Sequence, residues 1–174
     1  MPEQIRRQTP EQIAEDRIEA AFKSGARTLD LGRLGLAVLP DTIQKLRQLQ
    51  ELILWGNQLT TLPDALCNLH NLIALIASNN CLAALPNSLG QLTRLWSLDL
   101  KDNDLSALPE TLDQLTRLEA LYLDKNRFVT LPESITRLSH LQSLNVSSPG
   151  ARSGSGSSTS SIPRARPTTS PGAW

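Results

Sequence analysis

Apolar residues recur along this chain with a 23-residue period. In residues 51–73, ELILWGNQLTTLPDALCNLHNLI, leucines first stand two residues apart, at 52 and 54, and then return about every third residue. Steps of one period superpose five Leu-Pro pairs, at 39–40, 62–63, 85–86, 108–109 and 131–132. A period kept without insertion over five units is typical of proteins built from stacked repeats.

Each unit combines two hydrophobic patterns. Leu52 and Leu54 alternate with their neighbours, which predicts a short strand, and the later (I/L)-x-x-L-x-x-L spacing predicts a short helix or helical turn. One unit can bury its leucines only against the next unit. We therefore expect the units to stack into a solenoid whose parallel strands lie about 4.8 Å apart.

A single asparagine interrupts the apolar pattern of each unit. It recurs as Asn57, Asn80, Asn103 and Asn126, while Leu34 takes this place in the first unit. An amide in the interior can donate to and accept from backbone groups, and a buried group left unpaired costs about 1–3 kcal/mol. We interpret these residues as a structural asparagine ladder along the stack.

The unit L-x-L-x-x-N-x-L-x-x-L-P-x-x-(I/L)-x-x-L-x-x-L resembles the intracellular, 23-residue leucine-rich repeat (LRR) of the Ras-group type over residues 28–146. This resemblance implies an α/β fold: a right-handed LRR solenoid with parallel strands on the concave face, short helices on the convex face and an N-terminal capping helix. It also implies a scaffold or recognition module for intracellular signalling, whose partner is another protein such as a small GTPase.

Residues 17–40, RIEAAFKSGARTLDLGRLGLAVLP, carry a second resemblance, to the recognition arm of bacterial Roc-COR (Roco) proteins. The GTPase domain of those proteins is absent from this sequence. The alternative function is therefore a truncated or structural LRR fragment of a larger multidomain signalling protein, with a GTPase, kinase or ligase domain missing and no independent activity.

Residues 1–27 form an N-terminal arm and a capping helix in our interpretation. Thr9 suits an N-cap, Pro10 the first helical position and Gln12 the third, and the helix should end near Gly25. Its predicted apolar side, expected to cover the first repeat, consists of Ala14, Ile18, Ala21 and Phe22.

Residues 147–174 are rich in Ser, Gly and Pro and are predicted to be disordered. The sixth repeat keeps only Leu144 and Val146 before this tail. The end of the fifth repeat should then stay partly open to water, so we expect either end-to-end self-association through residues 128–146 or a shortened form of a longer protein. The residues expected at this open end are Phe128, Leu131, Ile135, Leu138 and Leu141.

Charge and cysteine content narrow the class of function. The chain has 17 Lys and Arg residues, 17 Asp and Glu residues and no evident basic stripe, which argues against nucleic-acid binding. Cys67 and Cys81 lack metal-ligand spacing and are expected to be structural thiols in a reducing compartment.

His70 and His140 fall on the outer side, so neither a metal nor another cofactor is expected. The N-terminus lacks an apolar run, which predicts no signal peptide, no membrane span and a cytoplasmic protein.

The functional surface is expected on the concave face, where the residues between the leucines point outward. An apolar half comes from the second and third repeats and a polar half from the fourth and fifth. For Trp55 and Trp96, local packing is the alternative to a binding role, and for the carboxylates the alternative is a solvated surface. Catalysis is not expected, because an open sheet lacks a pocket that excludes water. The predicted protein-binding residues are Ile53, Trp55, Ile76, Trp96, Asp99, Lys101, Tyr122 and Asp124.

Overall fold

The computed structural model describes residues 8–131 and 133–146. Pro132 and the tail from residue 147 onward, including its predicted disorder, lie outside the described residues. Helix α1 (Pro10–Ser24) precedes a series of strands and 3-10 helices. The strands are β1 (Thr28–Asp30), β2 (Glu51–Ile53), β3 (Ala74–Ile76), β4 (Ser97–Asp99), β5 (Ala120–Tyr122) and β6 (Ser143–Asn145). The 3-10 helices are η1 (Asp41–Lys45), η2 (Asp64–Asn68), η3 (Asn87–Gln91), η4 (Glu110–Gln114) and η5 (Glu133–Arg137).

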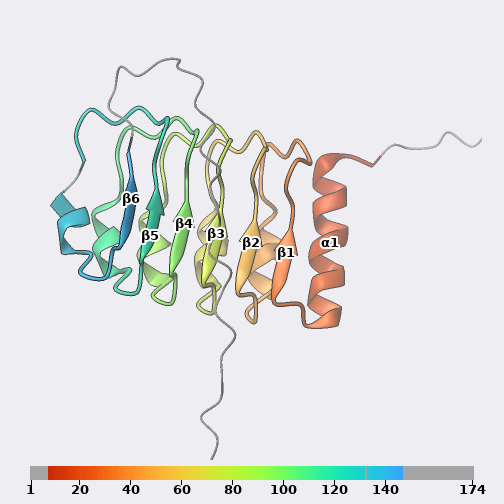
Figure 1. Cartoon of the computed structure of the whole chain (residues 1–174). Helices are drawn as coiled ribbons and strands as arrows, with labels where there is room; N and C mark the ends of the chain where they lie inside the picture. The colour runs from red at the N-terminus through yellow and green to blue at the C-terminus, as the bar shows by residue number, and fades with distance from the viewer. Residues whose placement is uncertain (1–7, 132, 147–174) are drawn as a thin grey trace, which may run out of the picture.

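The strands form one parallel sheet in the order β1-β2-β3-β4-β5-β6 (Figure 1). Leu29 pairs with Leu52, and Leu52 pairs with Leu75, so each partner lies one full repeat further along the chain. The sequence period is therefore the register of the sheet. The predicted LRR solenoid with an N-terminal helix is confirmed.

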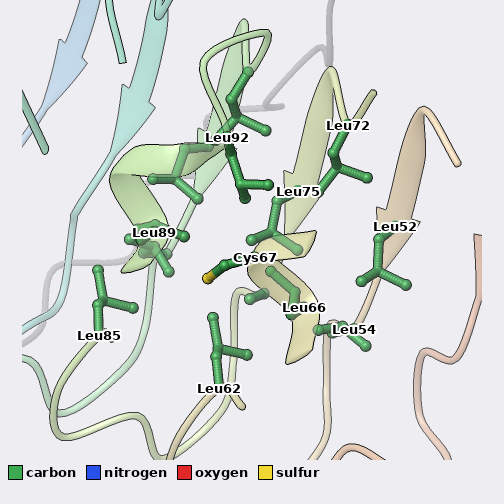
Figure 2. Packing of buried hydrophobic residues seen from close by; sticks show 14 of the residues in the cluster. Leu52, Leu54, Leu62, Leu66, Cys67, Leu72, Leu75, Leu85, Leu89 and Leu92 are labelled. Atoms are coloured by element: carbon green, nitrogen blue, oxygen red, sulfur yellow. The ribbon is translucent and has the colours of Figure 1, made fainter. Parts of the chain in front are cut away.

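Leucine side chains fill the interior between the strands and the 3-10 helices. Figure 2 shows buried leucines of successive coils packed against one another, with Cys67 among them. Full burial of one such side chain contributes about 1.5–3 kcal/mol. The helical turns predicted for the convex side are five-residue 3-10 helices, each of η1 to η4 beginning directly after the proline of a Leu-Pro pair.

Asn57 joins two neighbouring coils through its side chain. Its Nδ2 donates to the carbonyl oxygens of Leu31 and Leu54, at 2.9 and 2.8 Å. Its Oδ1 accepts from the backbone amides of Leu34 and Leu36, both at 3.1 Å. These backbone groups lie where the chain leaves the strands, so the amide replaces partners that the sheet does not supply.

The three later asparagines repeat this arrangement. Their Oδ1 atoms accept from the amides of Leu59, Leu82 and Leu105, respectively. Their Nδ2 atoms donate to carbonyl oxygens of their own coil and of the preceding coil. Each asparagine therefore connects its own coil to the preceding one. Asn80 and Asn103 are buried like Asn57, whereas Asn126 is half-buried.

Helix α1 lies beside β1 at one end of the stack (Figure 1). Its N-terminus has a capping box between Thr9 and Gln12, and Gly25 ends it in the left-handed conformation with φ of 65°. Ala14, Ile18 and Ala21 are buried. Phe22 was expected on the same side but is 50% exposed. At about 100° per residue, it projects roughly 80° away from Ala14, at the margin of the apolar side.

Strand β6 lies at the other end and pairs only with β5 among the described residues (Figure 1). Leu131 and Leu144 are 37% and 39% exposed there, whereas their counterparts in the inner repeats are buried. Phe128 and Ile135, also expected at an open end, are buried, as is Leu138. These side chains belong to the hydrophobic core, so the open apolar surface is smaller than the sequence predicted.

Candidate functional site

The concave face is formed by the outward side chains of the strands and of the residues that follow them. The parallel register places Ile53 beside Ile76, and Asp99 beside Tyr122. All four side chains are half-buried. Since each strand is only three residues long, the face is narrow and its chemistry changes from coil to coil.

Trp55 is fixed by contacts to the preceding coil. The guanidinium carbon of Arg33 lies 4.1 Å from the centre of its ring. A methyl group at Gly32 would be only 2.7 Å from the indole Nε1, so the ring lies directly against this glycine. A cation–π contact of this kind contributes about 0.5–1 kcal/mol at an exposed site. These contacts support local packing as one role of Trp55, and its role as a binding anchor stays a prediction.

Ile53 and Ile76 form the centre of the apolar half. They are register partners on neighbouring strands and belong to the same side of the sheet. Next to the start of β4, the backbone amide of Trp96 donates to the carbonyl oxygen of Ile73 at 2.8 Å. Ile73 and Trp96 therefore occupy neighbouring places at the edge of this surface, and both are half-buried.

Asp99 dominates the polar half. Its Oδ1 accepts from the backbone amide of Lys101 at 3.0 Å, and the Ser78 hydroxyl also donates to its carboxylate. Burial raises the pKa of Asp99, and repulsion from Asp124 acts in the same direction. The two hydrogen bonds and the charge of Lys101 oppose this rise. Folding thus brings Asp99, Lys101 and Asp124 into one electrostatically connected group.

Small side chains occupy the first position of β4 and β5. Ser97 and Ala120 were expected to point outward on the concave face, but both are buried. They are short, and larger residues stand on both sides of them in the sequence. A partner therefore meets the larger residues at the neighbouring positions, Tyr122 and Asp99 among them.

The convex side has a shallow polar depression of about 500 Å³ that sequence reasoning did not find. Residues of η1, η2 and η3 line it, including Asp41, Asp64 and Ser88. The Ser88 hydroxyl donates to the Asp64 carboxylate. Stacking of the coils brings equivalent positions of successive repeats together. In the sequence, the 23-residue register is therefore the only signal that could have indicated this depression.

Both cysteines are free thiols, but their surroundings differ. Cys67 is buried, and burial raises the pKa of its thiol. Cys81, also expected to be structural, is exposed. Among the described residues, no group of three or more His, Cys, Asp and Glu side chains has the arrangement of a metal site. The described helices include none that is long and apolar enough to span a bilayer.

Comparisons with known proteins agree with this architecture. Residues 47–105 match the family model described as leucine rich repeat. An LRR protein of Leptospira interrogans is 33% identical, with a TM-score of 0.67, over 71% of this chain and 38% of that chain. The LRR domain of a Shigella effector is 28% identical, with a TM-score of 0.67, over 82% of this chain and 59% of that chain. No curated protein matches the chain.

These comparisons support a leucine-rich repeat protein. The chain spans less than two thirds of the length of both solved relatives. The more specific resemblances to the Ras-group type and to Roc-COR proteins stay predictions.

Proposed function

We propose that this protein is a recognition module that binds another protein on its concave strand face. The observation that carries the proposal is the Ile53–Ile76 pair, two large apolar residues in register on a sheet face. Solenoids of stacked repeats use such extended concave surfaces for binding. A partner side chain that covers both isoleucines removes apolar surface from water, which is favourable by about 25 cal/mol per Å².

The polar half supplies orientation to this contact. Asp99, Lys101 and Asp124 carry both signs of charge within two neighbouring coils, and Tyr122 stands beside them. Charged groups at the rim of an apolar contact select the partner and its orientation more than they raise affinity. We therefore expect Ile53 and Ile76 to provide most of the affinity for the partner, and the polar half to determine which partner is bound.

We further propose a scaffolding role in cytoplasmic signalling, with a signalling protein such as a small GTPase as the partner. The Ras-group resemblance of the repeat unit supports this assignment, as do two free thiols, which suit a reducing compartment.

The second candidate is a repeat domain that works only within a longer protein. It is favoured by the coverage of the solved relatives, since this chain matches 38% and 59% of their lengths. In that case the isolated domain folds but captures no partner by itself.

Two double variants, each replacing two aliphatic residues by serine, distinguish these proposals. Ile53→Ser/Ile76→Ser removes the apolar centre, whereas Val38→Ser/Val129→Ser makes the same kind of change at exposed residues outside the concave face. Cross-linked proteins captured by wild type and by both variants would be compared by quantitative mass spectrometry, after thermal unfolding has shown that both variants remain folded.

We expect the concave variant to lose specific captured proteins by about tenfold and the control to retain them. Tyr122→Ala should change which proteins are captured more than it changes the total yield. Equal capture by the concave and control variants would refute the concave face as the binding surface. If wild type captures no specific protein at all, the second candidate is favoured.

A further inference from the structure

The segments that connect the 3-10 helices to the strands carry only one sign of charge. Residues 45–48, 68–71, 91–94, 114–117 and 137–140 contain five Lys or Arg residues and no Asp or Glu. The repeat register stacks these segments along one side of the solenoid, at the start of the strands. Folding therefore creates a basic row that no single stretch of the sequence shows, contrary to the expectation of a surface without a basic stripe.

Three arginines of this row keep their charge available. Lys45 pairs with Glu19 at 3.7 Å, and Arg137 pairs with Asp113 at 3.2 Å. Arg47, Arg94 and Arg117 are exposed and form no ion pair within residues 8–131 and 133–146. We call these three residues the basic edge.

Hydrogen bonds hold part of the basic edge in place. The Asn71 side chain donates through Nδ2 to the carbonyl oxygen of Arg47 at 2.8 Å. Its Oδ1 accepts from Nη1 of Arg94 at 2.7 Å. Asn71 is neutral, so it orients the Arg94 guanidinium without cancelling its charge. An oriented guanidinium loses less side-chain freedom when it binds an anion.

Arg94 and Arg117 occupy equivalent positions in neighbouring coils. Their segments are therefore about 4.8 Å apart, the spacing of the strands they lead into. Like charges at this spacing repel each other. A carboxylate placed between them relieves this repulsion and accepts charge-assisted hydrogen bonds from both guanidinium groups.

We propose that the basic edge docks an acidic, Asp- or Glu-rich segment of a partner protein. Charge complementarity carries this assignment, since the edge offers three guanidinium groups without a carboxylate partner among the described residues. The contact is separate from the concave face and includes neither isoleucine of its apolar centre, so it goes beyond the recognition role proposed above.

A protein segment fits the basic edge better than an anionic membrane does. Lipid recognition by charge typically requires clusters of about four to eight Lys or Arg residues. The edge has three, and Glu119 follows Arg117 by two residues and borders β5. A flat anionic surface would meet this carboxylate, whereas a peptide can place its own carboxylates on the arginines and avoid it.

The test uses a fluorescent oligo-glutamate peptide of moderate length, with binding followed by anisotropy at low and at physiological salt. The edge variant is Arg47→Gln/Arg94→Gln/Arg117→Gln. The control, Lys23→Gln/Lys125→Gln/Arg127→Gln, removes the same number of charges from positions elsewhere. Thermal unfolding would establish that both variants are folded.

We expect the edge variant to bind about tenfold more weakly than wild type and the control to stay within about threefold. Added salt should weaken wild-type binding, because the Debye length falls to about 10 Å at about 0.1 M. No binding by wild type at low salt, or equal loss in both variants, would overturn the proposal. Stronger binding to phosphatidylserine vesicles than to the peptide would overturn it in favour of a membrane surface.

Discussion

Replacing Asn103 by leucine should destabilise the protein through the backbone groups that its amide serves. The amide of Leu82 donates to Asn103 Oδ1 at 3.0 Å and has no other acceptor among the described hydrogen bonds. The carbonyl oxygens of Ala77 and Leu100 also accept from Asn103, but they keep bonds from the neighbouring asparagines of the ladder. The variant therefore leaves one buried N–H group without a partner.

The loss of stability can be estimated from the hydrogen bonds that Asn103→Leu removes. An unpaired buried N–H costs about 1–3 kcal/mol, and each lost hydrogen bond whose acceptor keeps a partner costs about 0.5–1.5 kcal/mol. Burial of the leucine side chain offsets roughly 1.5–3 kcal/mol. We expect a net loss of about 1–3 kcal/mol. Asn57→Leu should cost more, because Asn57 accepts from two amides, those of Leu34 and Leu36.

Urea unfolding followed by circular dichroism measures these differences, and hydrogen exchange at Leu82 tests their cause. Ser106→Ala, at an exposed position of the same coil, is the matched control and should cost under about 0.5 kcal/mol. Asp104→Ala is a weaker control, because Asp104 pairs with Arg127 at 2.6 Å, and should cost under about 1 kcal/mol. Equal urea midpoints for Asn103→Leu and Ser106→Ala would refute the structural role of the ladder.

Three further outcomes test other parts of the structure. Gly90→Ala would place a methyl group 2.5 Å from the Thr111 carbonyl oxygen and should lower the free energy of unfolding by about 1–3 kcal/mol. The control Gln91→Ala, at an exposed position, should have little effect in the same urea assay. Burial raises the folded-state pKa of Asp99 above its ordinary value of 3.8. The folded state therefore binds a proton at this carboxylate more readily than the unfolded state does. As a result, the contribution of Asp99 to stability rises as pH falls through the window just above 3.8. Asp99→Asn should therefore stabilise the protein at about pH 7, and an advantage that does not shrink as pH falls to about 4 would contradict this reasoning. Leu144→Lys should abolish any association through the β6 end, measured by sedimentation over about a hundredfold range of concentration, and a wild type that stays monomeric throughout would refute self-association there.

The period and the leucine pattern alone determined the architecture of this protein. A 23-residue spacing predicts which positions become neighbours, and the strand pairs Leu29–Leu52 and Leu52–Leu75 follow it. The cap of α1 was also predictable, since Thr9 and Gln12 act within one helical turn. Both results rest on local geometry or on a strict repeat, which a linear sequence displays directly.

Side-chain surroundings and some backbone conformations were not predictable in this way. Arg33, Asp102 and Lys125 adopt the left-handed conformation with φ of 55°, 57° and 55°, at the position where Gly56 and Asn79 supply residues suited to it. The coil turns at this point in each of the first five repeats, so the stack imposes the conformation even on residues that do not favour it. Arg33 and Lys125 belong to residue types that do not indicate this conformation, whereas Asp102, like Asn79, belongs to a type that adopts it more readily.

The candidate surfaces depended on the tertiary structure for the same reason. The sequence indicated Ile53 and Ile76 as outward residues, and the register made them neighbours. Only the folded coil placed Trp55 against Gly32 and under Arg33, a contact set by the direction of the indole ring. The sequence by itself thus determined which residues occupy equivalent positions in neighbouring coils. The three-dimensional stack decided what each side chain contacts, because those contacts depend on side-chain direction and on neighbours a full repeat away.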